Sequence, residues 1–278
     1  MQFLPVAVEL VFRFESNKTM GQIEIATFNV NGIRARLKNL LDWMSENKPD
    51  VVLLQEIKCV TESFPKEAIE DLGYNIALKG EKGFNGVAVL SKFPIEDVIL
   101  ELPGDSGDKQ ARWLECYIKS IKICNVYLPN GNPIGTTKYE YKLKWIERLT
   151  ERLRELRLLE EPVVVLGDFN VIPTKTDCHD PNSWLHDAIF QPEVRRAFQK
   201  LLNLGYTDSL KMFCLKEKIY TYWDYQRRSW ENNFGIRIDH CLLSPQAADK
   251  LQGIKIYSSV RQLEKPSDHV PVSITLSG

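Results

Sequence analysis

Two short stretches place polar side chains two positions apart after an apolar run. Asn29 and Asn31 follow IEIATF, and Asp168 and Asn170 follow VVVLG. In an extended segment, residues i and i+2 point to the same side, so each pair projects together if the strand continues through it. Asp and Asn are also frequent in turns, and a plain turn stays an alternative for either pair. The recurrence of the pattern at two strand ends favours one shared functional site.

A third apolar run, VVLLQE, ends in Glu56. With Asp168 and the asparagines it makes an oxygen-rich set, which suits Mg²⁺ or Mn²⁺ better than Zn²⁺. The six cysteines are scattered without Cys-x-x-Cys spacing, which indicates reduced thiols of a cytosolic protein and excludes structural zinc. The chain contains no G-x-S-x-G, P-loop or G-x-G-x-x-G motif. These residues fit water attack on a phosphoester, with a hard metal stabilising the developing charge.

A further cluster near the C-terminal end contains Asp239, Asp268 and His269. An imidazole that acts on a substrate needs an acceptor on its other nitrogen. Asp268 is the sequence neighbour of His269 and would point to the opposite face of an extended segment. We therefore expect Asp239 to orient His269 and Asp268 to face the metal, with a capped turn as the alternative. The histidines at positions 179 and 240 are expected to be structural.

The stretch IYTYWDYQRRSW at 219–230 combines five aromatic residues with Arg227 and Arg228, and a second basic group follows Asn31 at 34–38. Aromatic faces beside guanidinium groups suit a nucleic-acid backbone with a displaced nucleotide. The alternative is a core strand with a solvated turn. Since the net charge is −1, contact with nucleic acid has to come from a local patch.

The elements that carry these residues repeat in order. Each half reads as a strand, a polar loop, an amphipathic helix and an apolar strand that ends in an acid, Glu56 or Asp168. The pattern implies an α/β (α+β) fold in four layers, α-β-β-α: two packed mixed β-sheets flanked by helices, with the active site at one edge of the sheets. Strands are predicted at 23–30, 51–56, 74–78, 86–91, 121–128 and 163–170, and helices at 37–47, 65–71 and 138–159.

The chain resembles the exonuclease III family of AP endonucleases, within the endonuclease/exonuclease/phosphatase superfamily. LQE, GDFN and SDH alone are typical of the superfamily, whereas YTYWDY and NFGIRID are specific to the exonuclease III branch. The similar segments, in family order, are ATFNVNGIRAR (26–36), LLQEIK (53–58), NVYLPNG (125–131), VVLGDFNV (164–171), NNFGIRID (232–239) and KPSDHVPV (265–272).

The resemblance implies a role for each matching residue. Catalytic roles are implied for Tyr127, Asp168, Asn170, Asp239 and His269. A place near the metal is implied for Asn29, Glu56, Asp168, Asn170, Asp268 and His269. Contact with DNA is implied for Asn31, Arg34, Asn130, Tyr222, Asn233 and His269. Whether Asp168 or His269 handles the proton of the attacking water stays open at this point.

The resemblance also implies the activity. It predicts a Mg²⁺-dependent phosphodiesterase of base excision repair, with Mn²⁺ as a substitute, that cleaves duplex DNA 5′ of abasic sites and acts on 3′ ends as a 3′-to-5′ exonuclease and 3′-phosphodiesterase or phosphatase. The expected partner is double-stranded DNA, and the protein is expected to be monomeric and cytoplasmic, associated with the nucleoid during repair. The alternative is a superfamily phosphodiesterase for undamaged DNA or for phosphorylated lipids or inositols. A silent damage-binding module and a metal-stabilised structural protein are further alternatives.

Residues 1–20 do not fit this pattern. They are apolar but lack the basic start of a signal peptide, and a second methionine, Met20, precedes the first predicted strand. We interpret residues 1–20 as a dispensable extension without fixed structure or a product of start-site choice, and residues 21–278 as one exonuclease III-like catalytic domain. An ordered edge strand over about residues 6–14 is the alternative. No apolar run reaches the length of a membrane span.

Overall fold

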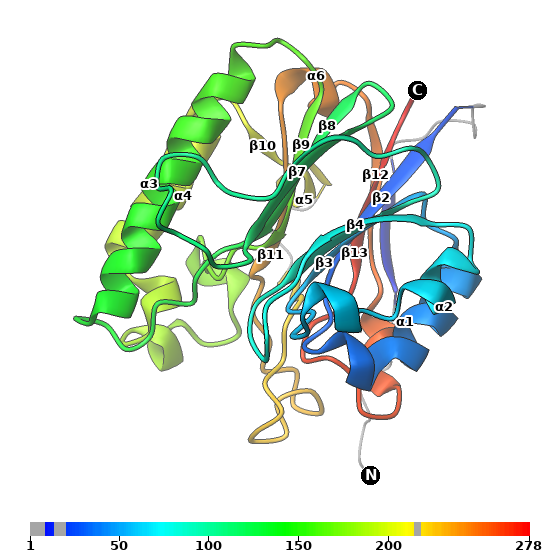
Figure 1. Cartoon of the computed structure of the whole chain (residues 1–278). Helices are drawn as coiled ribbons and strands as arrows, with labels where there is room; N and C mark the ends of the chain where they lie inside the picture. Colours follow the sequence, from blue (N-terminus) through cyan, green and yellow to red (C-terminus); the bar gives the residue numbers. More distant parts are fainter. Residues whose placement is uncertain (1–8, 14–20, 214–217) are drawn as a thin grey trace.

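Apolar runs in this chain form two mixed β-sheets that pack face to face (Figure 1). The computed structural model describes residues 9–13, 21–213 and 218–278. One sheet has the strand order β1 (Leu10–Arg13), β12 (Leu251–Ile256), β13 (Val272–Leu276), β2 (Ile23–Asn29), β3 (Val51–Gln55), β5 (Val87–Ser91) and β4 (Asn75–Lys79). The other has the order β10 (Thr207–Asp208), β11 (Asp239–Leu243), β9 (Val163–Asp168), β8 (Ile121–Tyr127), β7 (Trp113–Ile118) and β6 (Glu96–Ile99).

Helices cover the outer faces of both sheets, with α1 and α2 on one side and α3 and α4 on the other (Figure 1). The α-helices are α1 (Ile33–Asn47), α2 (Lys66–Glu70), α3 (Thr137–Arg157), α4 (Pro192–Asn203), α5 (Ser209–Phe213) and α6 (Pro245–Ala248). Short 3-10 helices span Thr61–Ser63, Lys175–Asp177, Pro181–Trp184, Ala188–Phe190 and Ser258–Gln262. The four-layer α-β-β-α fold predicted from the sequence is confirmed.

Each sheet contains one parallel strand pair joined by a helix. β2 and β3 are parallel with α1 between them in the chain, and β8 and β9 are parallel with α3 between them. The carboxyl ends of such a pair lie at the same edge of its sheet, which is where ligands bind in α/β proteins. The repeated order seen in the sequence therefore corresponds to two similar β-α-β units.

Two predicted boundaries need correction. α1 begins at Ile33, four residues before the predicted start, and β9 ends at Asp168 instead of Asn170. The second difference matters because the argument that i and i+2 share a face requires an extended chain, and Asn170 has a positive φ of 47°. The chain turns directly after Asp168.

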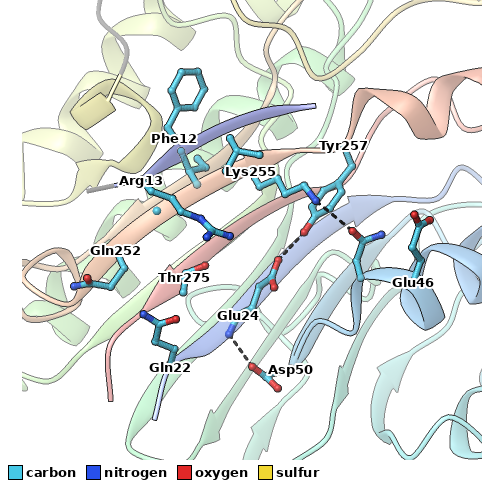
Figure 2. A pocket seen from close by; sticks show the side chains of 14 residues that line it. Phe12, Arg13, Gln22, Glu24, Glu46, Asp50, Gln252, Lys255, Tyr257 and Thr275 are labelled. Atoms are coloured by element: carbon cyan, nitrogen blue, oxygen red, sulfur yellow. Dashed lines mark hydrogen bonds between the residues drawn. The ribbon is translucent and has the colours of Figure 1, made fainter. Parts of the chain in front are cut away.

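Part of the N-terminal extension is ordered. Residues 10–13 form β1 and pair antiparallel with β12, from Leu10 opposite Ile256 to Arg13 opposite Gly253. For these residues the expectation of no fixed structure is wrong, and the alternative of an edge strand describes them; residues 1–8 and 14–20 lie outside the described residues. A cavity of about 490 Å³ lies beside β1. Figure 2 shows Arg13, Glu24, Asp50 and Lys255 among the side chains that line it.

The cysteines at 59, 116, 124, 178 and 241 are free and buried, and Cys214 lies outside the described residues. Among the helices of the described ranges, none is both long and apolar enough to cross a membrane.

A buried polar link joins the two sheets behind the site. Asn125 of β8 donates to the main-chain oxygens of Leu54 (2.9 Å) and Ala88 (2.8 Å), and Gln55 of β3 donates to Asn125 at 2.7 Å. Both side chains are fully buried. Since a buried polar group without a partner is costly, the Asn125 side chain depends on the other sheet for these hydrogen bonds, whereas Gln55 also donates to Thr27 and to the main-chain oxygen of Leu53 in its own sheet.

We expect Asn125→Ala to lower the free energy of unfolding by about 2–4 kcal/mol, because it removes three buried hydrogen bonds. Urea denaturation of the variant and the parent measures this. Asn203→Ala, at an exposed position at the end of α4, is the control and should change stability by no more than about 0.5 kcal/mol. Equal effects of the two substitutions would show that the inter-sheet link is energetically unimportant.

We expect a chain that starts at Gly21 to fold and keep its activity, because β1 is an edge strand of four residues that pairs only with β12. The thermal unfolding midpoint should fall, since the edge of β12 becomes exposed. Circular dichroism and thermal unfolding of both chains provide the measurement. Loss of the cooperative transition would mean that the extension is part of the domain.

Candidate active site

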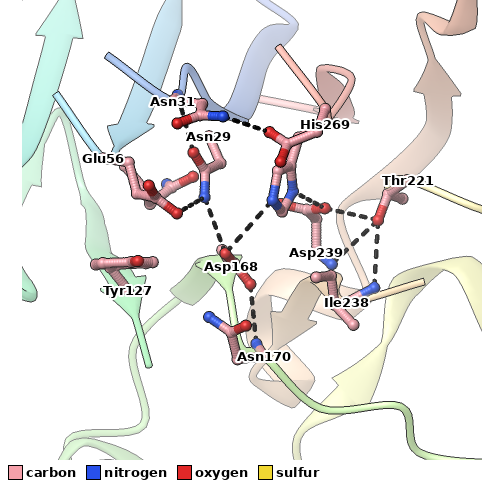
Figure 3. A network of polar contacts seen from close by, with 12 residues as sticks. Asn29, Asn31, Glu56, Tyr127, Asp168, Asn170, Thr221, Ile238, Asp239 and His269 are labelled. Carbon is pink, nitrogen blue, oxygen red and sulfur yellow. Dashed lines mark hydrogen bonds and ion pairs between the residues drawn. The ribbon is translucent and has the colours of Figure 1, made fainter. Parts of the chain in front are cut away.

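The polar residues singled out in the sequence meet at the edge where β2, β3, β8 and β9 end (Figure 3). Strand register sets this: Asn29 lies opposite Gln55, and Asp168 lies between Tyr127 and Asp239. The residues surround a cavity of about 270 Å³. Its lining is Glu56, Tyr127, Asn130, Asp168, Asn170, Trp184, Asp187, Ile189, Tyr222, Asp224, Ile236, Ile238, Asp268 and His269.

The two i, i+2 pairs form the same local turn. The side-chain oxygen of Asn29 accepts from the main-chain N–H of Asn31 at 3.0 Å, and that of Asp168 accepts from the N–H of Asn170 at 2.9 Å. Asn31 and Asn170 both have a positive φ, 46° and 47°, which Asn tolerates better than most residues. The turn expected as the alternative is therefore present at both pairs, and the functional role of the pairs stays a prediction.

The amide nitrogen of Asn29 connects two carboxylates from different sheets. It donates to Glu56 at 3.0 Å and to Asp168 at 2.9 Å, and Asn29 itself is fully buried. With this orientation the nitrogen of the amide faces the carboxylates, and its oxygen faces Asn31. Asn29 thus donates one hydrogen bond to each of two carboxylates that lie close together.

Lys58 is a site residue that the sequence reasoning missed. Its ammonium contacts a carboxylate oxygen of Glu56 and the side-chain oxygen of Asn31, and Asn31 also donates to Asp268 at 3.0 Å. Burial acts to raise the pKa of Glu56, but Lys58 and Asn29 together lower it below its ordinary value. Glu56 is therefore ionised at neutral pH. The signal available in the sequence was its place two residues after Glu56.

His269 lies between two buried carboxylates. Its Nδ1 is 2.8 Å from Asp239 and its Nε2 is 3.7 Å from Asp168, and Thr221 donates to Asp239 at 2.6 Å. Burial acts to lower the pKa of His269, but Asp239 and Asp168 raise it well above its ordinary value. Burial raises the pKa of Asp168, with the like charges of Asp239 and Glu56 acting in the same direction. At 3.7 Å, Nε2 of His269 and the Asp168 carboxylate are within ion-pair distance but beyond hydrogen-bond distance.

Tyr127 contributes a neutral phenol. Burial and the neighbouring charge of Glu56 raise its pKa well above the ordinary value, so the hydroxyl stays protonated at physiological pH. The guanidinium of Arg112 lies 4.7 Å from the centre of the ring. Such a cation–π contact fixes the ring against the end of β8.

Two asparagines after β8 and β9 hold each other. Asn130 donates to the side-chain oxygen of Asn170 at 3.2 Å, and Asn170 donates to the main-chain oxygen of Leu128 at 2.9 Å. Both line the cavity. They present an amide surface without negative charge, which suits a phosphate better than another carboxylate would.

One side of the cavity is apolar. Tyr222 packs edge-on against His269, with ring centres 4.9 Å apart, and Ile236 and Ile238 lie beside it in the lining. Trp184 and Ile189 complete the apolar lining from segment 171–191, and sequence reasoning did not single them out. The length of that segment was the available signal, since long loops in compact domains are commonly functional.

The aromatic stretch divides between the two readings made of it. Tyr220 and Trp223 are buried in the core between the sheets, whereas Tyr222 lines the cavity. Arg227 and Arg228 are exposed beyond it. The stretch forms no strand, so of the first expectation only the core packing describes it, at Tyr220 and Trp223, and contact with nucleic acid stays a prediction.

Some candidate residues lie outside the cavity. Arg34 is exposed on α1, and Asn233 is exposed and accepts from the indole of Trp223 at 3.0 Å. His179 stacks on a phenylalanine ring, and His240 is buried between Arg237 and a main-chain oxygen. His179 and His240 therefore have structural surroundings.

The oxygens at this edge suit a hard cation, although within the described ranges no three His, Cys, Asp or Glu side chains converge closely enough to enclose a metal ion. Glu56 and Asn31 already hold a cation, the Lys58 ammonium, between their oxygens. Mg²⁺ commonly binds proteins through one or two carboxylates and keeps waters or substrate phosphates as its other ligands. The residues present fit such a site.

Comparisons with known proteins agree with this geometry. The model of the Endonuclease/Exonuclease/phosphatase family matches residues 26–269. Exodeoxyribonuclease III of Haemophilus influenzae is 33% identical over 262 residues, which cover 90% of this chain and 98% of that protein. An AP endonuclease from Archaeoglobus fulgidus superposes with a TM-score of 0.88 at 37% identity, covering 91% of this chain and 99% of that structure.

A second solved structure includes a bound nucleic acid. The 3′ phosphatase NExo from Neisseria, bound to a product DNA hairpin, superposes with a TM-score of 0.89 at 35% identity and covers 92% of this chain and 100% of that one. The match extends across the whole fold and across the elements that carry the site residues. The chain therefore belongs to the endonuclease/exonuclease/phosphatase family and, within it, to the exodeoxyribonuclease III branch.

Proposed function

We propose that this protein is a DNA-repair nuclease that hydrolyses phosphodiesters of duplex DNA in the presence of Mg²⁺. It cuts 5′ of abasic sites and removes nucleotides and blocking groups from 3′ ends. The observation that carries the proposal is the joint presence, in one cavity, of the Asp239–His269–Asp168 array and a small apolar surface at Tyr222. Relatives named as an exodeoxyribonuclease III, an AP endonuclease and a 3′ phosphatase support the same chemistry.

The proposed metal-binding residues are Glu56, Asn31 and Asp268. Lys58 contacts Glu56 and Asn31, and Asn31 donates to Asp268. Mg²⁺, or Mn²⁺ in its place, supplies Lewis-acid stabilisation of charge on the phosphoryl and leaving oxygens. Asn29, Asp168, Asn170 and His269 border this position in the wider ligand set that the family resemblance implies. The geometry favours an indirect role for Asn29, since its nitrogen faces the carboxylates.

The proton transfer falls to Asp168. A water oxygen attacks phosphorus and gives its proton to the Asp168 carboxylate, while the bond from phosphorus to the 3′ oxygen breaks and that oxygen takes up a proton from solvent water. His269, which Asp239 keeps cationic, donates to a phosphoryl oxygen. The amides of Asn130 and Asn170 contact the same group, and the phenol of Tyr127 donates as well. These donors are in place before the reaction, so they stabilise the negative charge that develops on the phosphoryl group in the transition state.

Preference for abasic sites follows from size. The cavity of about 270 Å³ has Tyr222, Ile236 and Ile238 on its apolar side. A sugar that has lost its base can turn into this space, and we propose that the three apolar side chains exclude the larger intact nucleotide. Turning out a nucleotide is also least costly when its base is missing. Arg34 and Asn233 lie outside the cavity, at positions where flanking DNA could contact them.

We further propose that the protein acts as a monomer, in the cytoplasm and on nucleoid-associated DNA. The scattered, free cysteines of the described residues are consistent with a reducing compartment.

The first test is cleavage of an end-labelled duplex that carries one central abasic analogue, beside the same duplex with an intact nucleotide. We expect one cut 5′ of the lesion, only with Mg²⁺, and degradation from the 3′ end on the intact duplex. EDTA should abolish both while the circular dichroism spectrum stays the same. Equal internal cleavage of both duplexes would refute abasic preference and direct the search to other phosphoesters, and unfolding in EDTA would indicate a structural metal.

The second test is Asp168→Asn, which removes the proton acceptor but preserves the shape of the side chain. We expect turnover to fall at least about 10³-fold, within the range that general-base catalysis contributes, with DNA binding by fluorescence anisotropy kept. Asp71→Asn, at the exposed end of α2, is the matched control and should retain full turnover. Loss of DNA binding with unchanged turnover of the bound fraction would contradict the assigned role.

A further inference from the structure

One fully buried lysine lies beneath the active-site loops. Lys142 of α3 points its ammonium at two main-chain oxygens, that of Pro129 at 2.9 Å and that of Asn170 at 2.7 Å. Burial of an ammonium group costs free energy that two neutral acceptors offset only in part. Burial lowers the pKa of Lys142 to about 7, while the charges of Asp168 and Asp187 act to raise it. Packing alone therefore does not explain why a lysine occupies this buried position.

The two acceptors belong to the two loops that carry the amides. Pro129 immediately precedes Asn130 in the loop after β8, and Asn170 lies in the turn after β9. The side chains of Asn130 and Asn170 are joined at 3.2 Å on the cavity side of these loops. Lys142 thus ties the main chains together on the side that faces the helix, and the amides are tied together on the side that faces the substrate.

The loop after β8 is shaped around the lysine. A Cβ atom added at Gly131 would lie 2.6 Å from Cδ of Lys142, closer than van der Waals contact allows, and Gly131 has a φ of +89°. Any other residue at Gly131 would therefore push against the lysine stem and adopt a strained backbone. Glycine at this position lets the loop close over Lys142.

We propose that Lys142 is a positioning residue for phosphodiester hydrolysis. By holding the carbonyl groups of Pro129 and Asn170, it fixes the amides of Asn130 and Asn170 against the scissile phosphate. The inference rests on the proposed function, because it requires those amides to contact the phosphate in the transition state. An apolar residue in place of Lys142 would leave two buried carbonyl groups without donors and would free the loops to move apart.

The test uses Lys142→Met in the full chain, with steady-state kinetics on the abasic duplex in Mg²⁺. We expect kcat to fall about 10–100-fold with KM changed by no more than about 3-fold, because small displacements of positioned groups cost rate more than ground-state binding. Lys144→Met, at an exposed position on the same helix, is the control and should leave both constants unchanged. Lys142→Arg, which keeps charged donors, should recover at least half of the lost activity on a logarithmic scale.

A double-mutant cycle separates positioning from general loss of stability. In the Asn170→Ala background, Lys142→Met should lower kcat by less than about 3-fold, since residues that act through one another are not additive. A full additional loss, or an unchanged kcat in the single variant, overturns the role.

Where Lys142→Met does not fold, Lys142→Gln replaces it with the same expectations. A parent chain that cleaves no abasic or 3′-blocked DNA overturns the proposed function and this inference together, whereas an active parent confines a failure to Lys142.

Discussion

The amide of Asn29 bridges Glu56 and Asp168, and the rest of the site depends on that bridge. Glu56 follows a strand of one sheet and Asp168 ends a strand of the other, so the two carboxylates meet only when the sheets pack face to face. Two buried carboxylates repel each other unless a donor or a cation lies between them. Asn29 supplies the donor, and its oxygen in turn anchors the turn that presents Asn31.

Three residues of the site have unusual backbone conformations. Asn31, Glu56 and Asn170 all have a positive φ, and each directly follows or lies two residues beyond the end of a central strand. Such conformations are costly and persist where the surrounding structure determines them. Here the parallel strands are buried and rigid, and side-chain to main-chain hydrogen bonds hold the turns. The polar groups of the site are therefore held by rigid strands and hydrogen-bonded turns, whereas groups on ordinary loops are more mobile.

The sequence was informative wherever a residue pattern reflects a local rule. Apolar runs with known periods located β3 and α3 within two residues, and the exclusion of a neighbour as the partner of His269 pointed to Asp239, which lies 2.8 Å from it. The same rule of alternation failed for Asp168 and Asn170, because it assumes an extended chain and the chain turns there. Lys58 was missed although it lies two residues after Glu56, because a single basic residue there forms no periodic pattern, and Trp184 was missed because its place in the cavity depends on contacts with distant segments.

The sequence by itself determined the secondary structure of both β-α-β units, the chemical character of the polar residues at their ends, and the family to which the chain belongs. These properties depend on residue type and on spacing along the chain. Only the tertiary structure decided that Asn29 directs its nitrogen at two carboxylates, that Lys142 lies beneath Asn170, and that β1 joins the sheet through β12. The reason is physical: orientation, burial and charge pairing depend on residues far apart in the chain, and packing of the two sheets brings them together.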